Sequence, residues 1–238
     1  NLEWIHTTYI STKHHCHVAM EMLDMVHYPS LPKTYENLLP HINNFTDLLS
    51  LRNHKRLQEL KVRYRKLIGI QFYTHTDGHY AYDTNNTRNK SLLPKTVQQF
   101  INLCSVNGIG VVLLAPTPYT LRCVHDFSDL PVGLLFGIVS QVHAVVGIDS
   151  VCTHIAGVMN IPNLTVWKRY HPLRLSSPNG GKNLCYRPVS KNYSLVALSS
   201  QDEGGLSEKM FSILKKILTG TVQLHGGISD CFTGLEEF

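Results

Sequence analysis

The stretch AVVGIDSVCTHIAGVMNIPNLTVW, residues Ala144–Trp167, decides the fold of this 238-residue chain. An uninterrupted apolar run ends at Ile148, a helical pattern follows from Cys152 to Met159, and a second apolar run covers 164–167. Short apolar runs bounded by turn residues are typical of buried strands. The pattern therefore predicts a strand, a helix and a strand, which is the repeating unit of a parallel sheet.

The same alternation extends toward the N-terminus. The runs Leu67–Tyr73 (LIGIQFY) and Ile109–Leu114 (IGVVLL) predict two more buried strands. Between them, Pro94 predicts the first turn of a helix, and Asn107-Gly108 predicts its end. Strands that alternate with helices indicate an α/β fold, with a Rossmann-like parallel sheet covered by helices on both faces.

The pattern divides the chain into three parts. The pattern over residues 1–65 predicts helices joined by a proline-rich loop. We interpret this part as a helical N-terminal remnant and an interdomain linker. Residues 66–218 predict the Rossmann-like domain, including a candidate strand at Leu184–Arg187 and a helix over Gly205–Leu218. Residues 219–238 have weak periodicity, and we expect a loose C-terminal extension there.

Composition excludes several classes of protein. Apolar residues make up 43% of the chain and charged residues 16%, which is enough to bury a core and excludes intrinsic disorder. The longest apolar run, Val132–Val151, is interrupted by polar side chains, so no membrane span is predicted. The segment Asn1–Ile10 does not have the pattern of a signal peptide. Six cysteines without a Cys-x-x-Cys pair indicate reduced thiols in a cytoplasmic protein.

Polar residues gather where the predicted strand at 144–148 ends. Asp149 and Ser150 follow that strand directly, and Thr153 and His154 lie in the first turn of the next helix. Ligands of parallel sheets bind beyond the carboxyl ends of the strands, and the N-terminus of a helix attracts anions. Two interpretations stay open: a phosphate site, or plain capping with Ser150 as the N-cap and Asp149 balancing the helix dipole.

Three further polar residues follow the predicted strand at 67–73. Thr74 comes directly after it, and Thr87 and Lys90 precede the helix that opens at Pro94. A lysine at this place can reach a phosphate as a point charge. The alternative interpretation is a solvated surface side chain, which is the common state of a lysine.

Two histidine pairs are candidate sites. His14 and His17 would share one face of a helix, but a structural metal site needs about four ligands, so no metal is predicted. His75 and His79 flank a turn signal and predict a polar loop, with a lid over a ligand as the alternative.

These elements together resemble a known family, glycosyltransferase family 9, the ADP-heptose–lipopolysaccharide heptosyltransferases. The segment VVGIDSVCTHIAGVMNIPNLTVW resembles the family's donor-binding signature, in which Asp-Thr/Ser-Gly-x-x-His-x-Ala follows a strand. The segment NKSLLPKTVQQFINLC resembles the family's Lys-x-Trp-Pro helix opening. The resemblance covers about residues 14–218. The positions that match are Lys90, Pro94, Asp149, Ser150, His154, Ala156 and Pro162; Val151 stands where the family has glycine, and Leu93 where it has tryptophan.

The resemblance implies the C-terminal, nucleotide-sugar-binding half of a GT-B glycosyltransferase. It implies a heptosyltransferase-like enzyme of lipopolysaccharide biosynthesis that transfers a sugar, with inversion, to a glycan or lipid-linked acceptor. The nucleotide-diphosphate sugar is the donor substrate, and neither a metal nor another cofactor is implied. Donor binding is carried over to Thr74, Thr87, Lys90, Asp149, Ser150, Val151, Thr153 and His154.

The family's catalytic base lies in an N-terminal region that this chain does not contain, so no catalytic residue is assigned and the isolated chain is not expected to be active. Two alternatives of another class are a non-catalytic nucleotide-binding module and a Rossmann-like interaction domain.

The run Arg52–Lys66 contains seven basic residues and one acid, Glu59. We interpret it as a solvated helix that links two domains. The alternative is a surface for anionic lipid headgroups or a lipopolysaccharide acceptor, at the inner membrane. A nucleic-acid role is not predicted, because basic and aromatic residues are not interleaved.

Overall fold

A computed structural model gives the fold of the chain. The structure describes residues 51–73, 75–76, 79–80, 91–130, 132–148, 150–168, 192–197, 203–222, 224 and 230–232. Residues 1–50, which include His14 and His17, lie outside the described ranges.

The centre of the fold is a parallel sheet. Within the described ranges it has seven strands in the order β5-β4-β1-β6-β7-β8-β9, and every neighbouring pair is parallel. The strands are β1 Lys66–Gln71, β4 Ile109–Leu113, β5 His125–Asp126, β6 Ala144–Ile148, β7 Asn163–Lys168, β8 Asn192–Ala197 and β9 Asp230–Phe232. This confirms the predicted Rossmann-like parallel sheet of an α/β fold.

The strand order reverses once. The chain moves outward from β1 to β4 and β5, then returns to the other side of β1 to form β6 and the strands that follow. Strands β1 and β6 are therefore parallel neighbours. The chain continues from β1 toward one edge of the sheet and from β6 toward the other. The crevice beyond the carboxyl ends of such a pair is the usual ligand position in open α/β sheets.

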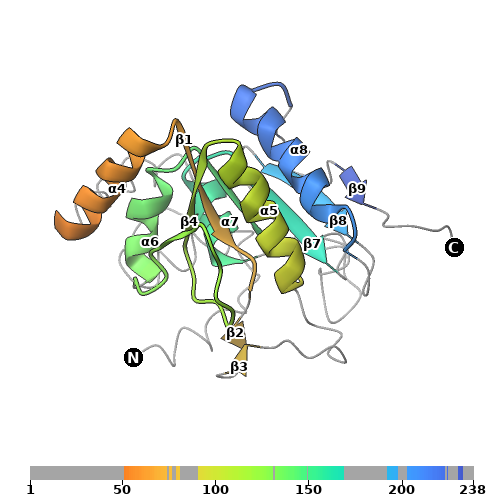
Figure 1. Cartoon of the computed structure of the whole chain (residues 1–238), viewed down its shortest axis with the longest axis horizontal. Helices are drawn as coiled ribbons and strands as arrows, with labels where there is room; N and C mark the ends of the chain where they lie inside the picture. Colours follow the sequence, from red (N-terminus) through yellow and green to blue (C-terminus); the bar gives the residue numbers. More distant parts are fainter. Residues whose placement is uncertain are drawn as a thin grey trace, which may run out of the picture.

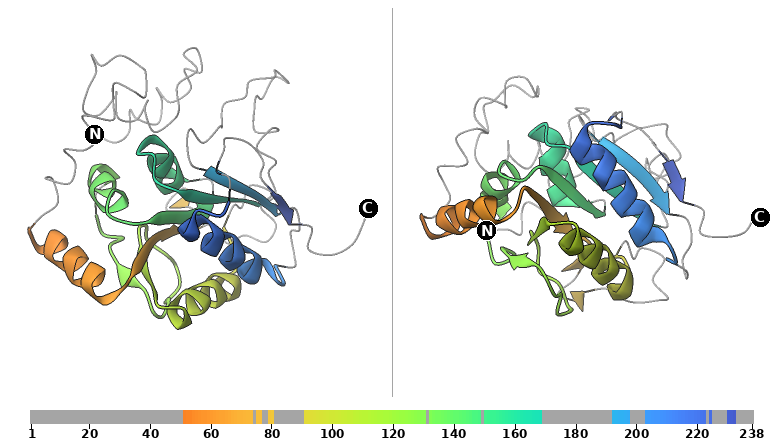
Figure 2. Two further views of the ribbon diagram at one scale, coloured as in Figure 1. Left: turned by 90° about the horizontal axis from the view of Figure 1, so that it is seen from above. Right: turned by 45° about the horizontal axis from the view of Figure 1, so that its top comes forward.

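Helices cover both faces of the sheet. Helices α5 (Pro94–Val106) and α8 (Leu206–Thr219) pack on one face, and α4 (Leu51–Arg63), α6 (Val132–Val139) and α7 (Val151–Val158) pack on the other. In Figure 1, α5 lies in front of the sheet and α7 behind it. The view from above shows the three layers, with α6 and α7 across the sheet from α5 and α8 (Figure 2, left).

The core follows the alternation of each strand. In β6, Val145 belongs to the apolar cluster under α4, α6 and α7, and Val146 belongs to the cluster under α5 and α8. Successive side chains of a strand point to opposite faces, so a strand between two helical layers must be apolar throughout. This is why β6 and β4 are buried along their full lengths.

Several predicted elements have the predicted bounds. Strand β6 covers 144–148 as predicted, and α5 begins at Pro94. Gly108, just past the end of α5, has a φ of 69°, the left-handed conformation that a side chain disfavours.

Other elements differ from the prediction. Strand β8 at 192–197 was not predicted, and the candidate strand Leu184–Arg187 lies outside the described residues. Residues 219–238, expected to form a loose extension, contribute β9, which pairs with β8. The polar stretch 74–90 contains a short antiparallel pair, β2 (His75–Thr76) with β3 (His79–Tyr80).

The basic helix α4 is part of the packed domain. Leu57 is fully buried and Leu60 is nearly so, both in the cluster under α4, α6 and α7. Arg56 donates to the Asp126 carbonyl oxygen at 2.8 Å, and its guanidinium lies 4.2 Å from the centre of the Phe127 ring. Lys61 donates to the Gln141 side chain, and partial burial lowers the pKa of Lys61. One side of the helix therefore packs against the domain.

Among the described helices, none has the length and apolar character needed to cross a membrane. Three described cysteines, Cys104, Cys123 and Cys152, are free thiols. Burial raises the pKa of Cys104 to about 12 and also raises that of Cys152, so both buried thiols stay protonated.

Gly147 and Gly69 provide a matched test of the packing at the sheet centre. A Cβ atom at Gly147 would lie 2.5 Å from the backbone oxygen of Gln71, whereas one at Gly69 would lie 2.5 Å from Cδ1 of Leu114. A side chain can rotate away, but a paired backbone carbonyl moves only with its strand. We expect Gly147→Ala to lower the free energy of unfolding by about 1–3 kcal/mol, and Gly69→Ala to cost less. Urea unfolding of both variants measures the difference, and an equal or larger cost at Gly69 would contradict the assigned contact.

Candidate functional site

The candidate site lies at the carboxyl edge of the sheet, between β1 and β6. Helix α7 begins at Val151, directly after β6. Ser150 takes the N-cap position, with an extended backbone (φ −156°, ψ 169°). The short connection places the N-terminus of α7, with its positive end of the helix dipole, at the point where the strand order reverses. Ser150 therefore takes the N-cap position that one of the two interpretations from sequence gave it, without a side-chain capping hydrogen bond.

Thr153 stabilises this turn from within the helix. Its hydroxyl accepts from the Ser150 N–H at 3.3 Å and donates toward the carbonyl oxygens of Ser150 at 2.9 Å and Ile148 at 3.1 Å. Thr153 is almost fully buried. Its hydroxyl is consequently engaged with the backbone of the turn, and its backbone N–H faces the Ser150 side chain in a capping-box arrangement.

Gln71, the last residue of β1, caps the same helix from the neighbouring strand. Its side-chain Oε1 accepts from the backbone N–H of Cys152 at 3.2 Å. Gln71 also pairs in register with Gly147 of β6. The capping role of Gln71 could not be predicted from the sequence, because 81 positions separate it from Cys152. The available signal was a polar residue near the carboxyl end of an otherwise apolar run.

The accessible part of the turn is small. Ser150 and Val151 are half-buried, whereas Cys152 is fully buried and His154 is only 8% exposed. The Oγ atom of Ser150 is buried and has no hydrogen-bond partner among the described residues. The exposed surface of this helix start is therefore limited to the other parts of Ser150 and to Val151.

Four of the sequence-predicted positions, Thr74, Thr87, Lys90 and Asp149, lie outside the described residues. The structure thus brings together Ser150, Val151, Thr153 and His154 on one helical turn. The side chains of His75 and His79 are also outside the description. The described residues contain no group of three or more His, Cys, Asp or Glu side chains that could hold a metal ion.

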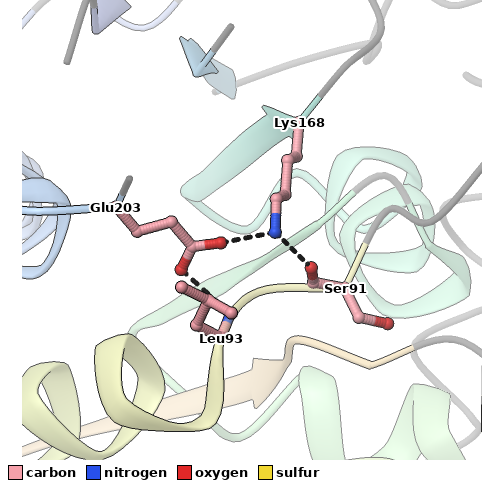
Figure 3. A network of polar contacts seen from close by, with 4 residues as sticks. All are labelled: Ser91, Leu93, Lys168 and Glu203. Carbon is pink, nitrogen blue, oxygen red and sulfur yellow. Dashed lines mark hydrogen bonds and ion pairs between the residues drawn. The ribbon is translucent and has the colours of Figure 1, made fainter. Parts of the chain in front are cut away.

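A second helix N-terminus, that of α5, lies at the same edge. Its N-cap, Leu93, has no side-chain acceptor, and the backbone N–H of Leu93 donates to Glu203 Oε2 at 2.9 Å. Glu203 also forms an ion pair with Lys168, with 2.5 Å between Oε1 and Nζ. Lys168 donates in addition to the Ser91 carbonyl oxygen at 3.0 Å. Figure 3 shows these four residues converging from β7, from the turn before α8 and from the segment before α5.

The Lys168–Glu203 pair is buried, with 6% and 3% of the two side chains exposed. The carboxylate of Glu203 takes the position that an anion would take at the N-terminus of α5. The two helix ends at this edge therefore differ. The α5 end meets a carboxylate from the chain itself, whereas the α7 end meets the neutral amide of Gln71.

Comparisons with known proteins give structural neighbours only. No protein-family model matches the chain, and no curated protein is similar to it in sequence at a significant level. Among solved structures, the glycosyl transferase family 9 protein of Veillonella parvula matches 72% of this chain and 53% of its own, with 10% identity and a TM-score of 0.43.

The heptosyltransferase WaaC of Escherichia coli, solved with ADP, matches 71% of this chain and 49% of its own, with 12% identity and a TM-score of 0.41. The chain spans about half the length of each of these two neighbours.

The cap from Gln71 can be tested by its effect on stability. Gln71→Ala removes the acceptor for the Cys152 N–H, and we expect a loss of about 1 kcal/mol in the free energy of unfolding. Gln71→Glu keeps an acceptor and adds a negative charge at a helix N-terminus, so it should be close to the wild type at pH 7. Thermal and urea unfolding measure both variants. Equal destabilisation by the two substitutions would contradict the capping role.

Proposed function

We propose that the chain is the nucleotide-sugar-binding half of a GT-B glycosyltransferase and that it holds the donor diphosphate at the N-terminus of α7. The observation that carries the proposal is the position of the partly exposed N-terminus of α7. It lies between β1 and β6, where the strand order reverses. Helix N-termini at such points bind phosphate groups through backbone N–H groups and the helix dipole.

The chemistry of the turn supports an anion. The backbone N–H of Val151 belongs to the first turn, where helices lack internal partners. Ser150 adds a buried hydroxyl without a partner among the described residues. Gln71 uses one backbone donor but brings no charge that would repel a phosphate.

The remaining predicted donor-site residues are assigned to the site on the basis of the family resemblance. Lys90 would supply a positive charge to the diphosphate, and Thr74 and Thr87 would supply hydroxyl donors. Asp149 would orient the ligand, and His154 would support the turn from its buried side. WaaC was solved with ADP, which makes ADP the first nucleotide to test.

The proposed reaction is an inverting transfer of a heptose-like sugar to a glycan or lipopolysaccharide acceptor. A carboxylate outside this chain would deprotonate the acceptor hydroxyl, which then displaces the nucleotide from the anomeric carbon. The groups at α7, together with Lys90, would stabilise the negative charge of the departing nucleoside diphosphate. The proposal requires neither a metal nor a further cofactor.

Val151 favours a second candidate function, a nucleotide-binding module without transferase activity. Its side chain is half-buried at the position where the resembled signature has glycine, and a side chain there narrows the approach of a phosphate to the backbone. Transfer of a radiolabelled sugar by the complete protein separates the two functions. Binding of ADP without transfer would favour the module.

Lys90 gives the sharpest test of the diphosphate site. We expect Lys90→Ala to weaken ADP binding by about 1–3 kcal/mol, the range for hydrogen bonds to charged groups. Isothermal calorimetry with ADP and UDP measures the affinity. The matched control is Lys216→Ala, which removes an exposed lysine from the far end of α8 and should leave the affinity unchanged. Equal affinities of wild type and Lys90→Ala would remove Lys90 from the site.

The proposal also includes peripheral contact with the cytoplasmic face of the inner membrane through residues 52–66. Arg52, Lys55 and Arg63 are exposed on α4, whereas Arg56 and Lys61 have partners within the domain. Each basic residue near an anionic surface contributes about 1 kcal/mol. We expect the chain to sediment with phosphatidylglycerol vesicles and the triple variant Arg52→Glu/Lys55→Glu/Arg63→Glu to stay in solution. Equal binding of both proteins, or binding to neutral phosphatidylcholine vesicles, would contradict this contact.

A further inference from the structure

Two buried, oppositely charged side chains lie at the carboxyl edge of the sheet without belonging to the proposed ligand turn. They are Lys168, the last residue of β7, and Glu203, which precedes α8. Removing two charges from water is costly, and a buried pair is by itself weak evidence of a contribution to stability. The backbone groups that the two side chains bind are therefore more informative about the role of the pair than the free energy that the ion pair contributes.

The pair holds both ends of one three-residue segment. Lys168 Nζ donates to the carbonyl oxygen of Ser91, and Glu203 Oε2 accepts from the N–H of Leu93 (Figure 3). Between them, the N–H of Leu92 donates to the carbonyl oxygen of Phe72 at 3.2 Å. Three backbone groups of the segment that opens α5, one C=O and two N–H groups, are thus bonded to other elements.

These bonds connect the segment to the ligand turn. Phe72 directly follows Gln71, and the Gln71 side chain caps α7 at Cys152. The helix end of α5 and the helix end of α7 are therefore both fixed to the carboxyl end of β1. In sequence, the segment begins directly after Lys90, the cation of the proposed diphosphate site.

We propose that Lys168 and Glu203 are a positioning pair, which fixes Ser91–Leu93 against the end of β1. The pair thereby holds Gln71, and with it the capped N-terminus of α7, in place for the diphosphate. This inference rests on the proposed function. Lys168 is not itself the cation for the ligand, because it is buried and its charge is matched by Glu203. The pair acts on the ligand through the geometry of the segment.

The test uses Lys168→Met, Glu203→Gln and the double variant, with ADP and AMP as ligands. Each single substitution leaves one buried charge unmatched, whereas the double variant removes both charges and keeps an acceptor for the Leu93 N–H. We expect each single variant to raise the Kd for ADP about tenfold, and the double variant to recover most of this loss. AMP lacks the second phosphate, so the preference for ADP over AMP should shrink in the single variants.

Hydrogen exchange of the Leu92 and Leu93 amides gives a readout that does not depend on a ligand. Both amides should exchange faster in the single variants than in the wild type. His143→Gln is the control at the opposite edge of the sheet, where His143 Nδ1 accepts from the Leu67 N–H at 3.1 Å. Its affinity for ADP should equal that of the wild type. All binding is measured well below the unfolding temperature of each variant.

The outcomes separate the two proposals. If the wild type binds neither ADP nor UDP, the proposed function fails and the positioning role fails with it. If the wild type binds ADP and both single variants keep its affinity, the positioning role is overturned while the proposed function stands. An equal loss of ADP and AMP affinity, with an unchanged preference for ADP, would indicate general damage and would also overturn the positioning role.

Discussion

The close approach of β1 to β6 at Gln71 and Gly147 is the constraint on which the rest of the site depends. Gly147 has no side chain, so the backbone oxygen of Gln71 can lie where a Cβ atom would otherwise be. The same Gln71 extends its side chain to the first turn of α7. One residue therefore joins the reversal of the strand order to the start of the helix that follows it.

Electrostatics at the carboxyl edge distinguishes the two helix ends that meet there. Glu203 supplies a carboxylate to the N-terminus of α5, and Lys168 balances that carboxylate. Gln71 supplies only a neutral acceptor to α7. Because the dipole of α7 is not matched by a charge among these contacts, its N-terminus is the better of the two places for an anionic ligand. The partial exposure of Ser150 and Val151 at the start of α7 agrees with this assignment.

Local patterns in the sequence were enough to predict the central strands β1, β4, β6 and β7 and the N-cap position of Ser150. Strand β6 and helix α5 could be predicted because apolar runs, a first-turn proline and a glycine after the helix are short-range signals. The short edge strands β5 and β9 could not, since two or three residues carry no periodicity and form strands through pairing with a neighbour. The hydrogen bonds of Gln71 with Cys152, of Lys168 with Ser91 and of Glu203 with Leu93 join residues 77 to 110 positions apart, and no local pattern reports them.

A crystal structure of the chain with ADP would show where the diphosphate binds. We expect the diphosphate to lie within hydrogen-bonding distance of the Ser150 side chain and the Val151 backbone N–H, beyond the ends of β1 and β6. Diphosphate bound at another edge of the sheet, or a helix start covered by other residues of the chain, would contradict it.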